Sequence, residues 1–214
     1  DGLPVSLTLG GLAMALALLL GCLAGAIAAL HQNRIGDYSV MTLAMTGISL
    51  PTFVIAPLLI LLFAVSLGWL PAGGWDTPGS AVLPVLALAL PQVAVVARLM
   101  RGSMIEVLRQ NYIRTARAKG LPEWRVVWRH ALKPALMPVL SYLGPATAAL
   151  ITGSVVIEQI FSVPGLGRHF VQGALNRDYT VVMGVVVFYG TLIITFNFMV
   201  DLLYGLLDPR VRHD

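Results

Sequence analysis

Charged side chains are rare in this sequence, and their rarity excludes an ordinary soluble domain. Only 11% of the 214 residues are Asp, Glu, Lys or Arg, whereas soluble domains contain about 25%. Apolar residues make up 57%, and several long stretches carry no charge at all. Such stretches are typical of helices that lie in a lipid bilayer, where an unpaired charge is costly.

Residues that could perform chemistry are also few. The single cysteine, Cys22, lies in an apolar stretch and excludes an internal disulfide bond. No Gly-rich loop followed by Lys-Ser or Lys-Thr occurs, so the chain cannot hydrolyse ATP unaided. The histidines lack the spacing of metal ligands: His31, His130, His169 and His213. We therefore predict no catalytic residue, no metal site and no cofactor bound by this chain, which disfavours an intramembrane enzyme.

Five apolar stretches approach or exceed the roughly 20 residues that a helix needs to cross the hydrocarbon core. They predict an all-α, polytopic transmembrane bundle. The stretches are Ser6–Leu30, Val40–Leu67, Ala81–Ala97, Val139–Ile157 and Val181–Tyr204. The first is too long for a signal peptide, and Asp1 stands where such a peptide needs a basic segment. Because the sequence does not begin with Met, we expect a preceding span to be missing from its front.

Glycine and proline mark special positions within these stretches. Gly21 and Gly25 form a GxxxG pattern, which allows two helices to approach closely. Four prolines are expected to kink the second and third spans: Pro51, Pro57, Pro84 and Pro91.

Basic residues predict how the chain is oriented. Segment 98–138, between the third and fourth spans, holds nine of the fourteen Lys and Arg residues. Arg34, Arg210 and Arg212 fall on the same side, and only Arg168 and Arg177 fall on the other. Cytoplasmic loops are enriched in Lys and Arg, so residue 1 should lie outside and residue 214 in the cytoplasm. Topology explains this basic loop sufficiently, and we predict no nucleic-acid partner.

The basic segment is patterned as two helices around a glycine. A first helix is predicted for Ser103–Lys119, ended by Gly120. A second begins at Pro122, in its first turn, and ends at Pro134. Its apolar stripe consists of Trp124, Val127, Trp128, Ala131 and Leu132, and its basic face of Arg125, Arg129 and Lys133. The pattern fits either a helix on anionic lipid or a small-residue helix that enters a groove of a partner protein.

A family resemblance favours the partner protein. Asn111–Leu121 resembles the cytoplasmic EAA loop of binding-protein-dependent ABC importer permeases, in the dipeptide/oligopeptide/nickel group and its first-permease branch. Further segments match in the same order: 49–53, 68–71, 161–168, 176–179, 201–204 and 208–210. The sequence departs from the general motif where Arg114-Thr115-Ala116 replaces Glu-Ala-Ala. The tail of the motif is displaced by one residue, at 130–134.

The resemblance implies the MetI-like fold of type I ABC importer permeases, as a single domain over 1–214 with a coupling loop at 98–138. It implies a permease in a bacterial-type plasma membrane, with a second paralogous permease, two cytoplasmic ATPases that hold ATP and Mg²⁺, and an extracytoplasmic binding protein. The ATPase-coupling residues would be Asn111, Tyr112, Arg114, Thr115, Ala116, Arg117, Ala118, Lys119, Gly120 and Leu121. The basic ones, Arg114, Arg117 and Lys119, would meet acidic or helix C-terminal groups of the ATPase.

The loop 158–180 is expected to face the binding protein. A tight turn alone would explain its glycines and proline, but a re-entrant or docking segment better explains its apolar residues. The loop residues assigned to this role are Phe161, Pro164, Gly165, Leu166, Gly167 and Arg168. We expect Glu158 to pair with Arg168, and the intramembrane Asp201 to pair with Arg98 or Arg101.

Small peptides are the expected substrate, with nickel chelates or glutathione-like compounds as the alternative in the same group. An ion-coupled secondary transporter is a weaker alternative. It should show internal repeats and several midplane carboxylates, and this sequence shows no repeat. A channel would not need the patterned basic loop.

Overall fold

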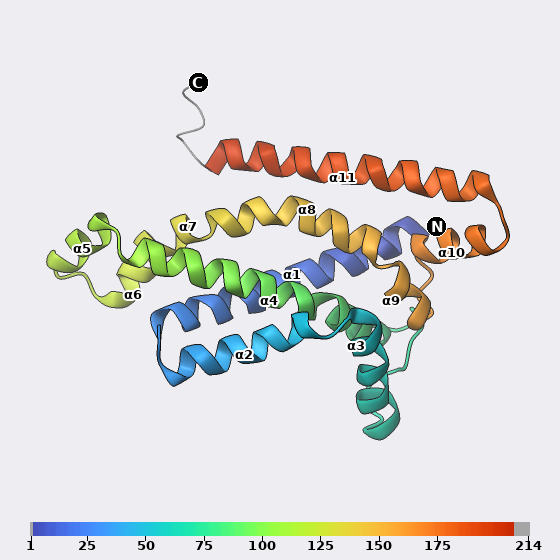
Figure 1. Ribbon diagram of the computed structural model, residues 1–214, viewed down its shortest axis with the longest axis horizontal. Coiled ribbons are helices and arrows are strands. Elements are labelled where there is room, and N and C mark those ends of the chain that lie inside the picture. The colour runs from blue at the N-terminus through green and yellow to red at the C-terminus, as the bar shows by residue number, and fades with distance from the viewer. Residues whose placement is uncertain (1, 208–214) are drawn as a thin grey trace.

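The computed structural model describes residues 2–207, which form helices, turns and loops with no strand among them. Four long helices run along the bundle: α1 (Gly2–Leu30), α4 (Val82–Leu108), α8 (Met137–Gly153) and α11 (Tyr179–Leu207) (Figure 1). Shorter elements join them: α2 (Ile35–Ser49), α3 (Thr52–Leu59), η1 (Ile60–Ser66), η2 (Pro78–Ala81), α5 (Asn111–Ala118), α6 (Glu123–Arg125), η3 (Val126–Ala131), α7 (Leu132–Ala135), α9 (Val155–Ile160) and α10 (Leu166–Leu175). The motif Asp208-Pro209-Arg210 and the basic residue Arg212 lie outside the described residues.

The predicted all-α bundle is confirmed. Within residues 2–207, four helices are long and apolar enough to cross a membrane, or five when the bent pair 35–66 is taken as one span. The bend measures 103° and falls between Ser49 and Thr52, beside Pro51. Proline disfavours a helical conformation in the residue before it, so the chain changes direction there. After Pro57 the helix widens into the π-helical segment η1.

Glycines bring the long helices into close contact. A Cβ atom at Gly21 would lie 2.7 Å from the Val96 side chain, and one at Gly25 would lie 2.5 Å from the Ala97 carbonyl oxygen. The GxxxG pattern of α1 therefore packs directly on the backbone of α4, as its spacing predicts. At Gly47 of α2, a Cβ atom would lie 2.5 Å from the carbonyl oxygen of Leu90, also in α4.

The bundle has two distinct ends. We call the end that holds the α1–α2 turn and residues 109–136 the basic end (Figure 1). Arg109 donates a 3.3 Å hydrogen bond to Gln32 there. The opposite end holds the loop 67–77 together with residues 161–178. At that end the Gly74 amide donates a 2.8 Å hydrogen bond to the Phe161 carbonyl. Segments that the Lys and Arg pattern assigns to one side thus lie at one end of the structure.

The helix predicted for Ser103–Lys119 is wrong. Helix α4 continues to Leu108, the chain turns at Arg109 and Gln110, and α5 begins separately at Asn111. Met104 and Ile113 are both fully buried. They are nine residues apart, so one straight helix would place them on opposite faces. The break lets both side chains reach the same core.

The second helix of the basic segment also differs from its prediction. Pro122 is extended and precedes α6, which begins at Glu123. The helical run α6–η3–α7 continues past Pro134 to Ala135, and its middle is π-helical. Pro134 cannot donate to the carbonyl of His130, which accounts for the widened turn. Trp124 and Trp128, predicted in the apolar stripe, are exposed.

Candidate functional site

Helix α5 projects from the basic end and exposes most of its surface. Ile113 is fully buried and Ala116 is 6% exposed, and these two residues fasten the helix to the bundle. The other predicted coupling residues of this helix and its end are exposed: Asn111, Tyr112, Arg114, Thr115, Arg117, Ala118, Lys119 and Gly120. Leu121 is half-buried. A short helix held from one side leaves its other side free to meet a second protein.

The core under α5 joins it to the spans. The fully buried members of this core come from several elements: Val96, Met100 and Met104 of α4, Ile113 of α5, Val126 and Ala131 of η3, and Ala135 of α7. A core packed this densely transmits displacement of one element to the others instead of absorbing it. The same core includes Val139 of α8, so α5, α4 and α8 are joined through continuous side-chain packing.

Gly120 ends α5 in the way that the sequence predicts. Its φ angle is +76°, in the left-handed region that favours glycine. The Leu121 amide donates to the Ala116 carbonyl at 3.4 Å, and the Gly120 amide donates to the Arg117 carbonyl at 2.9 Å. These two bonds form a Schellman motif, which fixes the direction in which the chain leaves the helix.

Arg117 is used within the loop itself. Its guanidinium donates two hydrogen bonds to the Glu123 carboxylate, at 2.5 and 3.0 Å. This bond from Arg117 lowers the pKa of Glu123 below its usual value. The pair bridges the Gly120 turn and braces α5 against α6. Among the described residues, Arg114 and Lys119 form no salt bridge, so their charges face outward.

A groove of about 360 Å³ runs beside α5. It is lined by Tyr112, Thr115, Ala116, Lys119, Leu121 and His130. Tyr112 is 46% exposed, and its partial burial raises the pKa of its phenol. The groove combines an apolar floor with a lysine and a histidine at its rim, which suits a protein side chain or loop.

Asp37 holds the basic end together from inside. Its side chain is 1% exposed, and it accepts two hydrogen bonds of 2.6 Å from Arg101 of α4. It also accepts a 2.9 Å bond from the Asn33 amide, in the turn between α1 and α2. The predicted pairing of Asp201 with Arg101 is therefore wrong. Asp201 is exposed, and the other candidate, Arg98, contacts the sulfur of Met45.

The opposite end carries the predicted binding-protein loop. Phe161 is fully buried, and Gly165 and Gly167 are buried as well. Leu166 is half-buried and begins α10, whereas Pro164 and Arg168 are exposed. The apolar residues of this loop thus belong to the core, and its polar and proline residues form the surface.

Glu158 organises this loop, and the sequence did not reveal its role. The side chain is fully buried. Its carboxylate accepts hydrogen bonds from Ser6 at 2.7 Å, Ser154 at 2.5 Å and the Gly167 amide at 2.8 Å. Within the described residues it makes no salt bridge, so its predicted pairing with Arg168 is wrong. An acid between two apolar runs was the available signal, but its partners lie up to 152 residues away.

Two glycines let the backbone wrap around this carboxylate. A Cβ atom at Gly165 would lie 2.3 Å from the Glu158 carboxyl carbon, and one at Gly167 would lie 2.5 Å from the Val155 backbone. Ser6 also accepts a 2.9 Å bond from the Leu166 amide. The start of α1, the start of α10 and helix α9 therefore meet at one buried acid.

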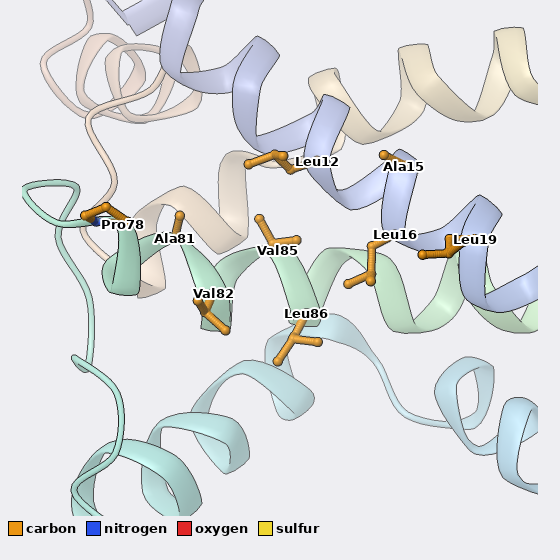
Figure 2. A pocket seen from close by; sticks show the side chains of 9 residues that line it. All are labelled: Leu12, Ala15, Leu16, Leu19, Pro78, Ala81, Val82, Val85 and Leu86. Carbon is orange, nitrogen blue, oxygen red and sulfur yellow. The ribbon is translucent and has the colours of Figure 1, made fainter.

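An apolar groove of about 570 Å³ lies along α1 and α4 near the opposite end (Figure 2). Its walls are Leu12, Ala15, Leu16, Leu19, Pro78, Ala81, Val82, Val85 and Leu86. Every lining side chain is apolar, so the groove offers no group that could orient a charged or polar substrate. It suits lipid chains or another apolar helix.

A family model described as "Binding-protein-dependent transport system inner membrane component" matches residues 9–213. The chain is 57% identical over 214 residues to the oligopeptide transport system permease protein OppB of Escherichia coli K12, covering 98% of this chain and 69% of that protein. It is 51% identical over 211 residues to the dipeptide transport system permease protein DppB of Bacillus subtilis, covering 99% and 68%.

Solved structures resemble nearly the entire chain in fold. The inward-facing MetNI methionine ABC transporter superposes with a TM-score of 0.82 at 18% identity, covering 97% of this chain and 94% of the other. An amino acid ABC transporter crystallised with histidines gives 0.74 at 19% identity, covering 95% and 91%. At these identities the likeness shows the fold alone.

Proposed function

Because the chain belongs to the family of binding-protein-dependent transport system inner membrane components, we propose that it is the permease subunit of an ATP-driven importer of small peptides. The proposed substrate class rests on one observation: the chain is more than 50% identical in sequence to proteins named as oligopeptide and dipeptide permeases. It is a transport subunit and not an enzyme. ATP and Mg²⁺ are held by separate ATPase subunits.

Helix α5 is the contact to one of these ATPases. Its exposed face carries Arg114 and Lys119, whose outward charges suit acidic or helix C-terminal groups on the partner. Arg117 belongs to the same contact and also braces the helix against Glu123. The dense core beneath α5 supports transmission of the ATPase movement to the spans as a rigid-body rotation.

The opposite end meets the extracytoplasmic binding protein. The exposed Pro164 and Arg168 belong to a loop that the Glu158 hydrogen bonds hold in one shape. With the basic end in the cytoplasm, residue 1 lies outside and residue 214 inside a bacterial-type plasma membrane. A second, paralogous permease completes the path, as the exposed apolar side chains Val187, Ile194 and Phe198 on α11 support.

Reconstitution tests this function directly. The complete transporter, with its second permease and ATPases, is placed in vesicles with the binding protein, and uptake of labelled di- and oligopeptides is measured. We expect uptake that requires ATP, both partner classes and this chain. If a nickel chelate or glutathione were taken up and peptides were not, the proposed peptide substrate would be wrong, and that compound would be the substrate. Uptake driven by an ion gradient without ATP would overturn the function itself.

A further inference from the structure

Two tryptophans at the basic end are exposed although they are large and apolar. Trp124 is 65% exposed and Trp128 is 72% exposed. They lie four residues apart on the helical run α6–η3, so their side chains share one face. Tryptophan is enriched at the boundary between lipid and water, where its ring is buried among lipid headgroups and its N–H reaches water.

A groove of about 500 Å³ separates these tryptophans from the end of α1. It is lined by Leu30, His31, Glu123, Trp124, Val127 and Trp128. Leu30 is the last residue of α1, the most apolar of the described spans, so the groove lies at the end of a helix that is apolar enough to cross a membrane. It shares no lining residue with the groove beside α5.

Unopposed positive charge flanks the tryptophans. Arg125, Arg129 and Lys133 are exposed, and within the described residues none of them forms a salt bridge. The sequence contains no acidic residue from 124 to 157, and Glu123 is already paired with Arg117. The Arg125 guanidinium lies 5.1 Å from the centre of the Trp124 ring. A ligand here must therefore combine apolar length with negative charge.

We propose that this surface binds an anionic phospholipid of the cytoplasmic leaflet. An acyl chain occupies the groove between Leu30, Val127 and the tryptophan rings, and the phosphate lies against Arg125 and Arg129. The inference rests on the proposed orientation, which puts the basic end at the cytoplasmic leaflet. The ATPase contact lies apart from it, at α5.

Quenching by brominated lipid tests the site. The complete transporter is placed in nanodiscs that contain brominated phosphatidylglycerol or brominated phosphatidylcholine at equal fractions. Tryptophan fluorescence is compared with that of the W124F/W128F variant, which gives the background from all other tryptophans. We expect the difference signal to be quenched more strongly by the anionic lipid.

Charge variants separate lipid recognition from general attraction. In the R125Q/R129Q variant, removal of each arginine should reduce the preference for the anionic lipid by about fivefold. The matched control, R98Q/R109Q, removes two exposed charges near the end of α4, outside both the lipid groove and the ATPase contact, and should retain the preference. All four side chains are exposed, so the variants are expected to fold; assembly is checked by size-exclusion chromatography.

Three outcomes would overturn the inference. Equal quenching by both lipids would indicate apolar contact only. Absence of quenching by either lipid would indicate that a protein subunit covers the tryptophans. An equal loss of preference in both charge variants would indicate a diffuse field instead of a site. Failure of the proposed function would appear separately, as loss of ATP-dependent peptide uptake by the unmodified transporter.

Discussion

At the scale of single residues, two acids are buried in the described part of the chain, and their burial is compensated in different ways. Asp37 is held by an arginine and one amide, whereas Glu158 is held by two hydroxyls and one amide. Burying a carboxylate is costly unless hydrogen bonds or a counter-charge compensate it. Each acid also joins segments distant in sequence, so its loss should separate them.

Ser6 and Ser154 provide a matched test of the Glu158 site. Both hydroxyls are fully buried and donate to the same carboxylate oxygen. Ser6→Ala also leaves the Leu166 amide without its acceptor, so it should destabilise the protein by about 1–3 kcal/mol. Ser154→Ala, which removes a bond within one helical run, should cost less. Thermal unfolding of the purified complex checks this order, and an equal or larger effect of Ser154→Ala would contradict it.

A double-mutant cycle tests the Asp37–Arg101 pair. Removing one partner leaves the other charge unpaired, which is costly for a buried pair. Asp37→Ala should cost about 2–4 kcal/mol, and the cost is limited because Arg101 is partly exposed. The coupling energy between D37A and R101A should be about 2 kcal/mol. The exposed pair Arg117–Glu123 is the control, with an expected coupling of about 0.5 kcal/mol. Equal couplings would contradict the role given to burial.

At the scale of elements, the sequence predicted the C-terminal end of α5 better than its N-terminal start. Gly120 is a strong local signal, because few other residues adopt φ of +76°. The break at Arg109 and Gln110 has no such signal, since it depends on where Met104 and Ile113 are buried. The same holds for Glu158, whose partners come from distant segments. At these two positions the sequence did not predict the structure, because each depends on specific side-chain contacts between distant segments.

Gly120→Val should abolish uptake while membrane insertion stays intact. Each non-glycine residue in the left-handed conformation costs about 1–2 kcal/mol, and a β-branched one costs more. No described atom lies within 4 Å of the position a Cβ would take, so the strain would come from the backbone alone. Gly102→Val is the control, because Gly102 is equally uncrowded but helical. Normal uptake by the Gly120 variant would rule out its role in directing the chain.

The Arg117–Glu123 brace predicts a pH dependence. Because the folded protein lowers the pKa of Glu123, the pair stabilises the loop above the unfolded value of about 4.5 and is lost as pH falls through the lower folded value. After correction for intrinsic rates, the hydrogen-exchange rates of the Gly120 and Leu121 amides should be constant from pH 7 to pH 5.5. Below pH 4.5 these rates should rise, because the loop opens more often once the pair is lost. Glu123→Gln should lack this acid limb. The effect should stay below about 1 kcal/mol, since both side chains are exposed.

At the scale of the whole molecule, the distribution of Lys and Arg anticipated which segments meet. The charges of segment 98–138 and Arg34 gather at one end of the structure, and the loops around Gly74 and Phe161 gather at the other. Topology signals are additive over the sequence, so they survive errors in single helix boundaries. The size of the 103° bend in the second span, in contrast, was not apparent from composition. The apolar stretch predicts one kinked span, but the bend turns η1 away from the axis of α2.

Cysteine labelling checks the orientation. In a Cys22→Ser background, Lys119→Cys should react with an impermeant thiol reagent from the cytoplasmic side alone, and Ser162→Cys from the outer side alone. Both positions are exposed. Labelling of residue 119 from outside the cell would invert the topology and remove the basis for the ATPase contact.

The glycine contacts of α4 limit how the permease can change shape. Backbone meets backbone or side chain at Gly21 and Gly25 of α1 and at Gly47 of α2, with no slack for sliding along the helix axes. We therefore expect these three helices to turn together if α5 is displaced during transport. Relative movement has to occur where packing is looser, and α11 is the least buried of the long helices that the structure describes. Fluorescent reporters on α1 and α4 should accordingly keep a constant separation throughout the transport cycle, whereas a pair on α4 and α11 should not.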